Sequence, residues 1–190
     1  KNPGQSVLID DFSLQTNDGG IIEGGNPEQP EEPGDAILSE TFANGFGVFT
    51  PQDITGTQAW YADTQYHYVK MSAYQQGSTY DNEDWLVSPA VDLSKSRTLA
   101  FEQAFGPANK DMSNAAEIYT LWVSDNYSGD VATATWTQVA IEYPSESGWT
   151  FVPTSVTLPA TGKNAHFAFK YKNTASDATL TWEIKNLTVK

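Results

Sequence analysis

The stretch "HFAFKYK" (residues 166–172) alternates between large apolar side chains and smaller or polar ones. Phe167, Phe169 and Tyr171 occupy every second position, which places them on one face of an extended chain because side chains alternate across a β-strand. The stretch "RTLAFEQAF" (residues 97–105) shows the same alternation. Both stretches therefore predict strands with one buried face.

Short apolar runs of this kind recur between turn signals from residue 37 to the end of the chain. This pattern is typical of an antiparallel sandwich or barrel. No window shows a sustained helical period, and the best helical candidate (residues 113–122) has a β-branched and aromatic second half. We predict an all-β protein with strands within residues 37–42, 57–63, 67–74, 84–93, 97–105, 118–125, 135–141, 150–158, 166–172 and 180–189.

The composition excludes several kinds of site and partner. The chain has no cysteine, which excludes disulfides, thiolate zinc sites and cysteine nucleophiles. No run of apolar residues is long enough to span a membrane. A net charge of −14 argues against nucleic-acid binding, which needs a basic surface. The acidic surface either attracts divalent cations or keeps the protein soluble.

Residues 16–36 are rich in glycine, proline and acidic residues, and Ile21 and Ile22 are their only bulky apolar side chains. Such a composition is typical of a linker between folded parts. We therefore expect three parts: a terminal strand left from an upstream domain (residues 1–15), the acidic linker, and a β-sandwich domain (residues 37–190).

Two stretches at opposite ends of the chain share one spacing of apolar residues. "VLIDDFSL" (residues 7–14) and "WEIKNLTV" (residues 182–189) both place apolar residues at intervals of two, three and two. The extra residue predicts a β-bulge, at Lys185 and Asn186 in the second copy. The match favours a tandem pair of related domains, with chance as the alternative. We expect Val7–Leu14 to pair with a sheet edge of this domain or of a neighbouring copy, because an isolated apolar strand needs a partner.

Three stretches resemble one protein family: "SETFANGFGVF" (residues 39–49), "DNEDWLVSPAVDLS" (residues 81–94) and "WEIKNLTV". They are similar to the choice-of-anchor J, or cleaved-adhesin, domains of Bacteroidetes surface proteins, in the same order along residues 37–190. The resemblance implies an antiparallel jelly-roll β-sandwich of the galactose-binding-like type, without catalytic machinery. It also implies an extracellular or outer-membrane location, with a lipid anchor in a part of the protein outside this chain.

The resemblance further implies a structural calcium ion near the junction of the first and last strands, at the positions of Glu40 and Asn186. Calcium prefers about six to eight hard oxygen ligands, and Asp81, Asn82 and Asp84 form a second oxygen-rich cluster. The lysine that precedes Asn186 repels a cation. A bulge without metal is therefore the alternative.

One run of the sequence is dense in tryptophan and tyrosine. Trp60, Tyr61 and Tyr66 are the candidate ligand-binding residues of this run, because aromatic rings stack on the apolar faces of sugars. The alternative is that Trp60, together with Tyr68 and Tyr74, fills the core, as aromatic residues in strands usually do.

The sequence shows no nucleophile elbow, phosphate-binding glycine loop or zinc-protease motif. We therefore hypothesise a non-catalytic extracellular adhesion or glycan-contacting module, whose partner is a glycan or a host or cell-surface protein. The alternatives are a structural spacer and an accessory domain of a larger secreted hydrolase.

Overall fold

The computed structural model describes residues 35–190. The expected terminal strand Val7–Leu14 and nearly all of the expected linker lie outside this part of the chain. The described residues form one short helix, α1 (Ala115–Ile118), and the strands β1 (Leu38–Glu40), β2 (Thr50–Thr55), β3 (Tyr61–Asp63), β4 (Tyr68–Met71), β5 (Tyr74–Gln75), β6 (Ser78–Thr79), β7 (Asn82–Val87), β8 (Val91–Leu93), β9 (Arg97–Gly106), β10 (Tyr119–Ser124), β11 (Thr137–Val139), β12 (Gly148–Leu158), β13 (Gly162–Asn173) and β14 (Thr181–Val189).

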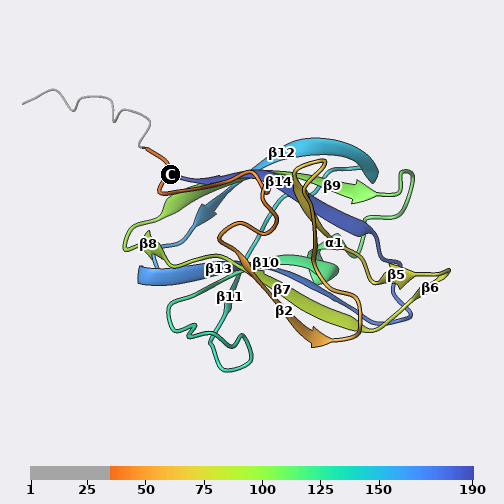
Figure 1. Cartoon of the computed structure of the whole chain (residues 1–190), viewed down its shortest axis with the longest axis horizontal. Helices are drawn as coiled ribbons and strands as arrows, with labels where there is room; N and C mark the ends of the chain where they lie inside the picture. The colour runs from red at the N-terminus through yellow and green to blue at the C-terminus, as the bar shows by residue number, and fades with distance from the viewer. Residues whose placement is uncertain (1–34) are drawn as a thin grey trace, which may run out of the picture. The chain divides into compact units, whose positions relative to one another are not determined.

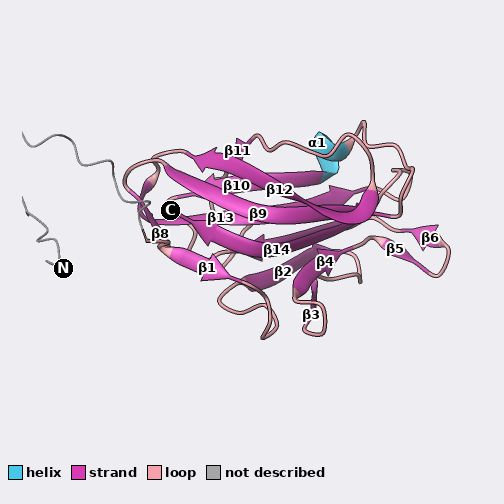
Figure 2. Cartoon of the chain, turned by 90° about the horizontal axis from the view of Figure 1, so that it is seen from above, coloured by secondary structure: helices cyan, strands magenta, loops and turns pink. Residues whose placement is uncertain are grey.

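The strands form two antiparallel six-stranded sheets that face each other (Figure 1). The first sheet has the order β12-β9-β14-β4-β3, with β1 paired to β14. The second sheet has the order β11-β10-β13-β7-β2, with β8 paired to β13, and β5 and β6 form a separate hairpin. Figure 2 shows β12, β9 and β14 next to one another in the first sheet. The predicted all-β jelly-roll sandwich is confirmed.

Aromatic side chains fill the space between the sheets. Trp182 of β14 is fully buried, and its ring lies 5.9 Å from Trp60, 6.0 Å from Phe105, 5.7 Å from Tyr119 and 5.6 Å from Phe169, measured between centroids. These partners come from both sheets and from the segment before β3, so one ring joins the two layers.

The alternation of side chains in β13 places its large apolar residues in the core, as predicted. Phe167, Phe169 and Tyr171 are all fully buried in the main core. Lys170, between them, lies on the outer face and pairs with a carboxylate there. Because successive side chains of a strand point to opposite faces, β13 has one face in the core and one outer face.

The last strand contains the predicted β-bulge. Its pairing with β9 passes from Lys185 opposite Glu102 to Thr188 opposite Ala100, so β14 uses one residue more than its partner. Asn186 within the bulge has a φ of 50°, in the left-handed region that asparagine tolerates better than most residues. The spacing of apolar residues is therefore explained by the bulge, which returns Leu187 to the core.

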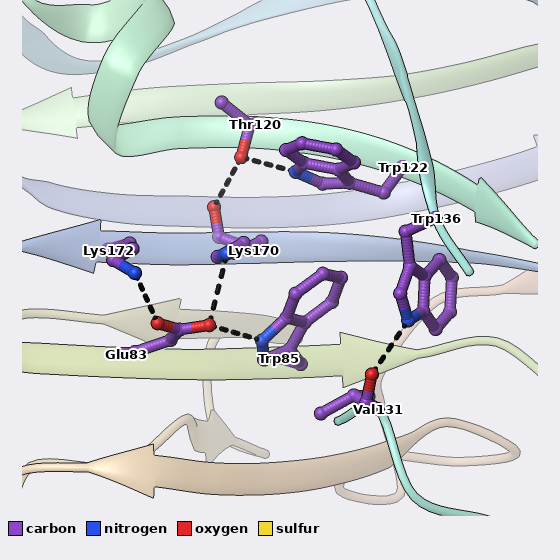
Figure 3. A network of polar contacts seen from close by, with 8 residues as sticks. All are labelled: Glu83, Trp85, Thr120, Trp122, Val131, Trp136, Lys170 and Lys172. Carbon is purple, nitrogen blue, oxygen red and sulfur yellow. Dashed lines mark hydrogen bonds and ion pairs between the residues drawn. The ribbon is translucent and has the colours of Figure 1, made fainter. Parts of the chain in front are cut away.

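A second, smaller apolar cluster lies on the outer face of the second sheet (Figure 3). Trp85 contacts Trp136 at 5.0 Å and Trp122 at 6.1 Å between ring centroids, and the Lys170 ammonium lies 4.6 Å from the centre of the Trp85 ring. The segment 125–136 contributes three members of the cluster, and β7 and β13 contribute Val87 and Ala168. Trp85 is therefore buried outside the main core, beneath a loop.

Glu83 forms ion pairs with two lysines at the edge of this cluster. Its carboxylate lies 3.0 Å from the Lys170 ammonium and 2.7 Å from that of Lys172, and it accepts a hydrogen bond from the Trp85 indole (Figure 3). Burial raises the pKa of Glu83, but the hydrogen bonds from Lys172, Lys170 and Trp85 outweigh it, so the pKa lies below its usual value. The ionised carboxylate is therefore favoured by folding.

Glu83→Gln is expected to lower the free energy of unfolding at pH 7 by about 1–3 kcal/mol, because Lys170 loses its charged partner. The contribution of the carboxylate is present above its unfolded pKa and is lost as the pH falls through the lowered folded pKa. Urea unfolding at pH 7 and at pH 3 measures both effects. A difference between variant and wild type that stays the same at the two pH values would contradict this account.

Candidate functional site

The outer face of the first sheet carries the candidate site. In β4, Val69 and Met71 are fully buried, so Tyr68 and Lys70 point outward. In β14, the same alternation turns Glu183 toward the outer face. The strand register decides which of these side chains become neighbours.

One row of residues crosses four strands of this face. Tyr61 of β3 lies opposite Lys70 of β4, Lys70 lies opposite Glu183 of β14, and Glu183 lies opposite Ala104 of β9. Directly opposite residues in antiparallel strands share a face and have adjacent side chains. The row therefore places a cation and a carboxylate side by side, between an aromatic ring and a small residue.

Trp149 of β12 lies beyond the other end of this row, next to β9. A Cβ atom added to Gly106 would lie 2.2 Å from the Trp149 ring, so the ring rests directly on the backbone of this glycine. Only glycine leaves room for the indole at this position. The ring is still 54% exposed, and it thus forms a flat apolar surface open to solvent.

Together these residues form a groove of about 400 Å³, which we call the outer-face groove. Its walls include Tyr61, Tyr74 and Trp149, which are all more than half exposed, and its floor includes Lys70 and Glu183. A more apolar pocket of about 530 Å³ adjoins it and shares three lining residues with it: Ser72, Tyr74 and Thr181. The volume and the mixture of apolar walls with a few polar groups are typical of a small-ligand site.

The charges in the groove are only partly hydrated. Burial raises the pKa of Glu183, and the nearby Lys70 ammonium opposes this shift. Burial and the charge of Glu183 raise the pKa of the neighbouring Tyr68 to about 12, so its hydroxyl stays protonated near neutral pH. The floor therefore offers a carboxylate and an ammonium as hydrogen-bonding groups, and the Tyr68 hydroxyl lies outside the groove lining.

The predicted aromatic residues are divided between the core and this face. Trp60 is only 4% exposed and packs against Trp182, so it cannot face a ligand, which corrects that part of the prediction. Tyr61 lines the groove, while Tyr66 is 63% exposed but does not line it. Tyr66 instead stacks on Tyr68, with ring centroids 6.3 Å apart.

Sequence reasoning missed two walls of the groove. Trp149 is far from the aromatic run in sequence and reaches the site only because β12 pairs with β9. Tyr74, which the alternative prediction placed in the core, is 59% exposed, and Tyr68 also lies outside the core. The glycine that precedes Trp149 is a weak local signal that this tryptophan lies outside a regular strand pattern.

Glu40 and Asn186, the first pair of predicted calcium ligands, do not converge. Glu40 accepts hydrogen bonds from the backbone N–H groups of Phe42 and Val48, whereas Asn186 donates to Glu102 on the outer face of the first sheet. Both side chains therefore have partners of their own, and their present placement does not fit a shared cation.

Within the second predicted cluster, Asn82 and Asp84 are buried and contact each other. Asp81 lies apart from them, because its carboxylate accepts a hydrogen bond from the backbone N–H of Ala175. Among residues 35–190, no group of three or more histidine, aspartate or glutamate side chains is placed to hold a metal ion.

Neither a family model nor a curated protein sequence matches the chain. Solved structures do show the same fold. A cleaved adhesin domain of Lys-gingipain from Porphyromonas gingivalis matches with a TM-score of 0.53 and 19% identity, over 80% of this chain and 96% of that domain. The similarity establishes the β-sandwich architecture that the two proteins share.

Two xylan-related structures also have this fold. A CBM22 xylan-binding domain from Paenibacillus barcinonensis matches with a TM-score of 0.50 and 10% identity, over 82% of this chain and 99% of that domain. A Clostridium thermocellum xylanase fragment with CBM22 and GH10 modules, complexed with xylohexaose, matches with a TM-score of 0.51 and 10% identity, over 82% of this chain and 28% of that one. Across residues 35–190, no helix is long and apolar enough to cross a membrane.

Proposed function

We propose that residues 35–190 form a non-catalytic carbohydrate-binding module and that the outer-face groove is its binding site. The observation that carries this proposal is the arrangement of three exposed rings, Tyr61, Tyr74 and Trp149, around a floor that contains Lys70 and Glu183. Apolar and polar groups thus meet within one open groove.

This arrangement matches the chemistry of a sugar ring. A pyranose has apolar C–H faces that pack on aromatic rings and hydroxyl groups at its edge that need donors and acceptors. Trp149 and Tyr61 offer the rings, and Glu183 and Lys70 offer an acceptor and a donor. An open groove also accepts an internal segment of a polysaccharide, since neither end of the ligand has to enter a closed cavity.

The comparisons support the proposal at the level of the fold. One similar domain is called an adhesin domain and another a xylan-binding domain, which supports a binding role for this chain, but the fold does not specify the ligand. The xylanase in which such a module accompanies a GH10 module supports the idea of an accessory domain of a larger secreted hydrolase. An extracellular or outer-membrane location, with a lipid anchor elsewhere in the protein, is part of the same proposal.

The test is affinity electrophoresis in native gels that contain xylan, mixed-linkage β-glucan, galactan, mannan or a host mucin. We expect at least one polysaccharide to retard the protein, while a reference protein of similar size migrates unchanged. If no polysaccharide retards it and a glycan array is also blank, the carbohydrate proposal is overturned. A structural spacer or a protein-binding adhesin would then be the better account.

A further inference from the structure

A second polar cluster lies at the inner face of the second sheet, away from the outer-face groove. Its members are Asp53 of β2, Asn82 and Asp84 of β7, and Asn173 of β13. Asp53 lies opposite Asp84 and Asn173 lies opposite Asn82, so adjacent strands bring the four side chains to one face. Asp84 is 0% exposed, Asn82 1% and Asn173 6%, while Asp53 on the edge strand is open to solvent.

Three buried oxygens of this cluster have no hydrogen-bond partner: Oδ1 of Asn82, Oδ1 of Asp84 and Oδ1 of Asn173. The amide nitrogen of Asn173 donates to the backbone carbonyls of Tyr80 and Thr174, which leaves its oxygen on the other side. A buried polar atom without a partner is costly to folding. The Asn82 amide nitrogen donates to Asp84, so its oxygen lies on the other side of the amide. All three oxygens are acceptors, and each of them lacks a hydrogen-bond donor or a cation.

The charge of the cluster favours a cation over a neutral donor. Neither Asp53 nor Asp84 forms an ion pair with a lysine, arginine or histidine within the described residues. Two neighbouring carboxylates therefore share a partly buried site without a positive charge.

We propose that Asp53, Asn82, Asp84 and Asn173 form a binding site for a divalent cation of the calcium type. Carboxylate and amide oxygens are the ligands that calcium prefers, and its coordination tolerates an irregular set completed by water. Solvent-exposed Asp53 leaves one side open for the ion and its waters. The ion joins β2, β7 and β13 and neutralises Asp84.

This site differs from the calcium sites expected from the sequence. It keeps Asn82 and Asp84 but replaces Asp81, whose carboxylate is bound to the Ala175 N–H, with Asp53 and Asn173. The site is independent of carbohydrate binding, because none of its four residues lines the outer-face groove.

The test is a thermal melt of EDTA-treated, dialysed protein with added calcium chloride, together with isothermal titration calorimetry. At calcium concentrations about 100-fold above the dissociation constant, we expect the melting temperature to rise by about 5–10 °C. Asp84→Asn and Asp53→Asn are expected to weaken calcium binding at least tenfold. Asp53 lies on an exposed edge strand, so Asp53→Asn still tests the site if Asp84→Asn does not fold.

Two matched controls locate the ion. Asp81→Asn and Glu40→Gln each remove a carboxylate that the sequence assigns to calcium, and both variants are expected to keep the full calcium response. The proposal is overturned if wild-type protein shows neither a melting shift nor a heat of binding with calcium. It is also overturned if Asp53→Asn and Asp84→Asn respond like wild type, or if Glu40→Gln abolishes the response.

Discussion

Trp182→Ala is expected to lower the free energy of unfolding by about 3–5 kcal/mol, the largest effect of any single substitution that we describe. The ring is fully buried and packs against aromatic residues from both sheets, so its removal leaves a cavity that rigid neighbours cannot fill. The indole N–H also donates to Gln103, whose buried amide oxygen would lose this donor.

Urea unfolding followed by circular dichroism measures this effect. Trp182→Phe is the matched control: it keeps an aromatic ring in the core but removes the donor to Gln103, so its cost should be clearly smaller. A loss below about 1 kcal/mol for Trp182→Ala would mean that the two sheets are not held together at this point.

Trp149→Ala is expected to weaken the binding of a retained polysaccharide at least tenfold, which corresponds to about 1.4 kcal/mol. The ring packs on Gly106 but lies outside the apolar core, so the free energy of unfolding should change by about 1 kcal/mol or less. Affinity electrophoresis and urea unfolding on the same preparation separate the two quantities.

Tyr66→Ala is the matched control for this prediction. Tyr66 is an exposed aromatic residue on the same side of the sandwich, but it does not line the outer-face groove. Its removal should leave binding within about twofold of wild type. If Tyr66→Ala abolishes binding and Trp149→Ala does not, the ligand lies on the run of tyrosines and the groove is the wrong site.

The strands that could be predicted from the sequence are those with a strong alternation of large apolar residues. β9, β10, β13 and β14 each bury one face against the other sheet, and the local pattern records that burial. The bulge in β14 was also predictable, because an extra residue shifts the apolar spacing by one.

β2 was missed because it leaves almost no hydrophobic signal. Its sequence, "TPQDIT", is mostly polar and contains Pro51, which is tolerated because β2 is an edge strand with β7 as its single neighbour in the sheet. The predicted strand over residues 84–93 is in fact two strands, β7 and β8, separated around Pro89.

The candidate sites depend on strand pairing, which local patterns do not encode. Tyr61 and Trp149 line one groove because β4, β14 and β9 connect β3 to β12 in the sheet. Asp53 lies opposite Asp84 only because β2 pairs with β7. The sequence therefore revealed only part of each site: Tyr61 of the groove, and Asn82 and Asp84 of the polar cluster. Trp60 was wrongly predicted to bind a ligand, because its neighbours in sequence are exposed whereas its own ring is buried in the core.

The most direct test of the proposal that the outer-face groove binds carbohydrate is a heteronuclear NMR titration with soluble oligosaccharides of the retained polysaccharides. Each of the six tryptophans gives one indole N–H signal, and Trp149 is the one that lines the groove. We predict that the Trp149 indole signal shifts with increasing ligand, together with backbone signals of Tyr61 and Glu183. Shifts confined to Trp85, Trp122 and Trp136 on the opposite sheet, with Trp149 unchanged, would contradict this account.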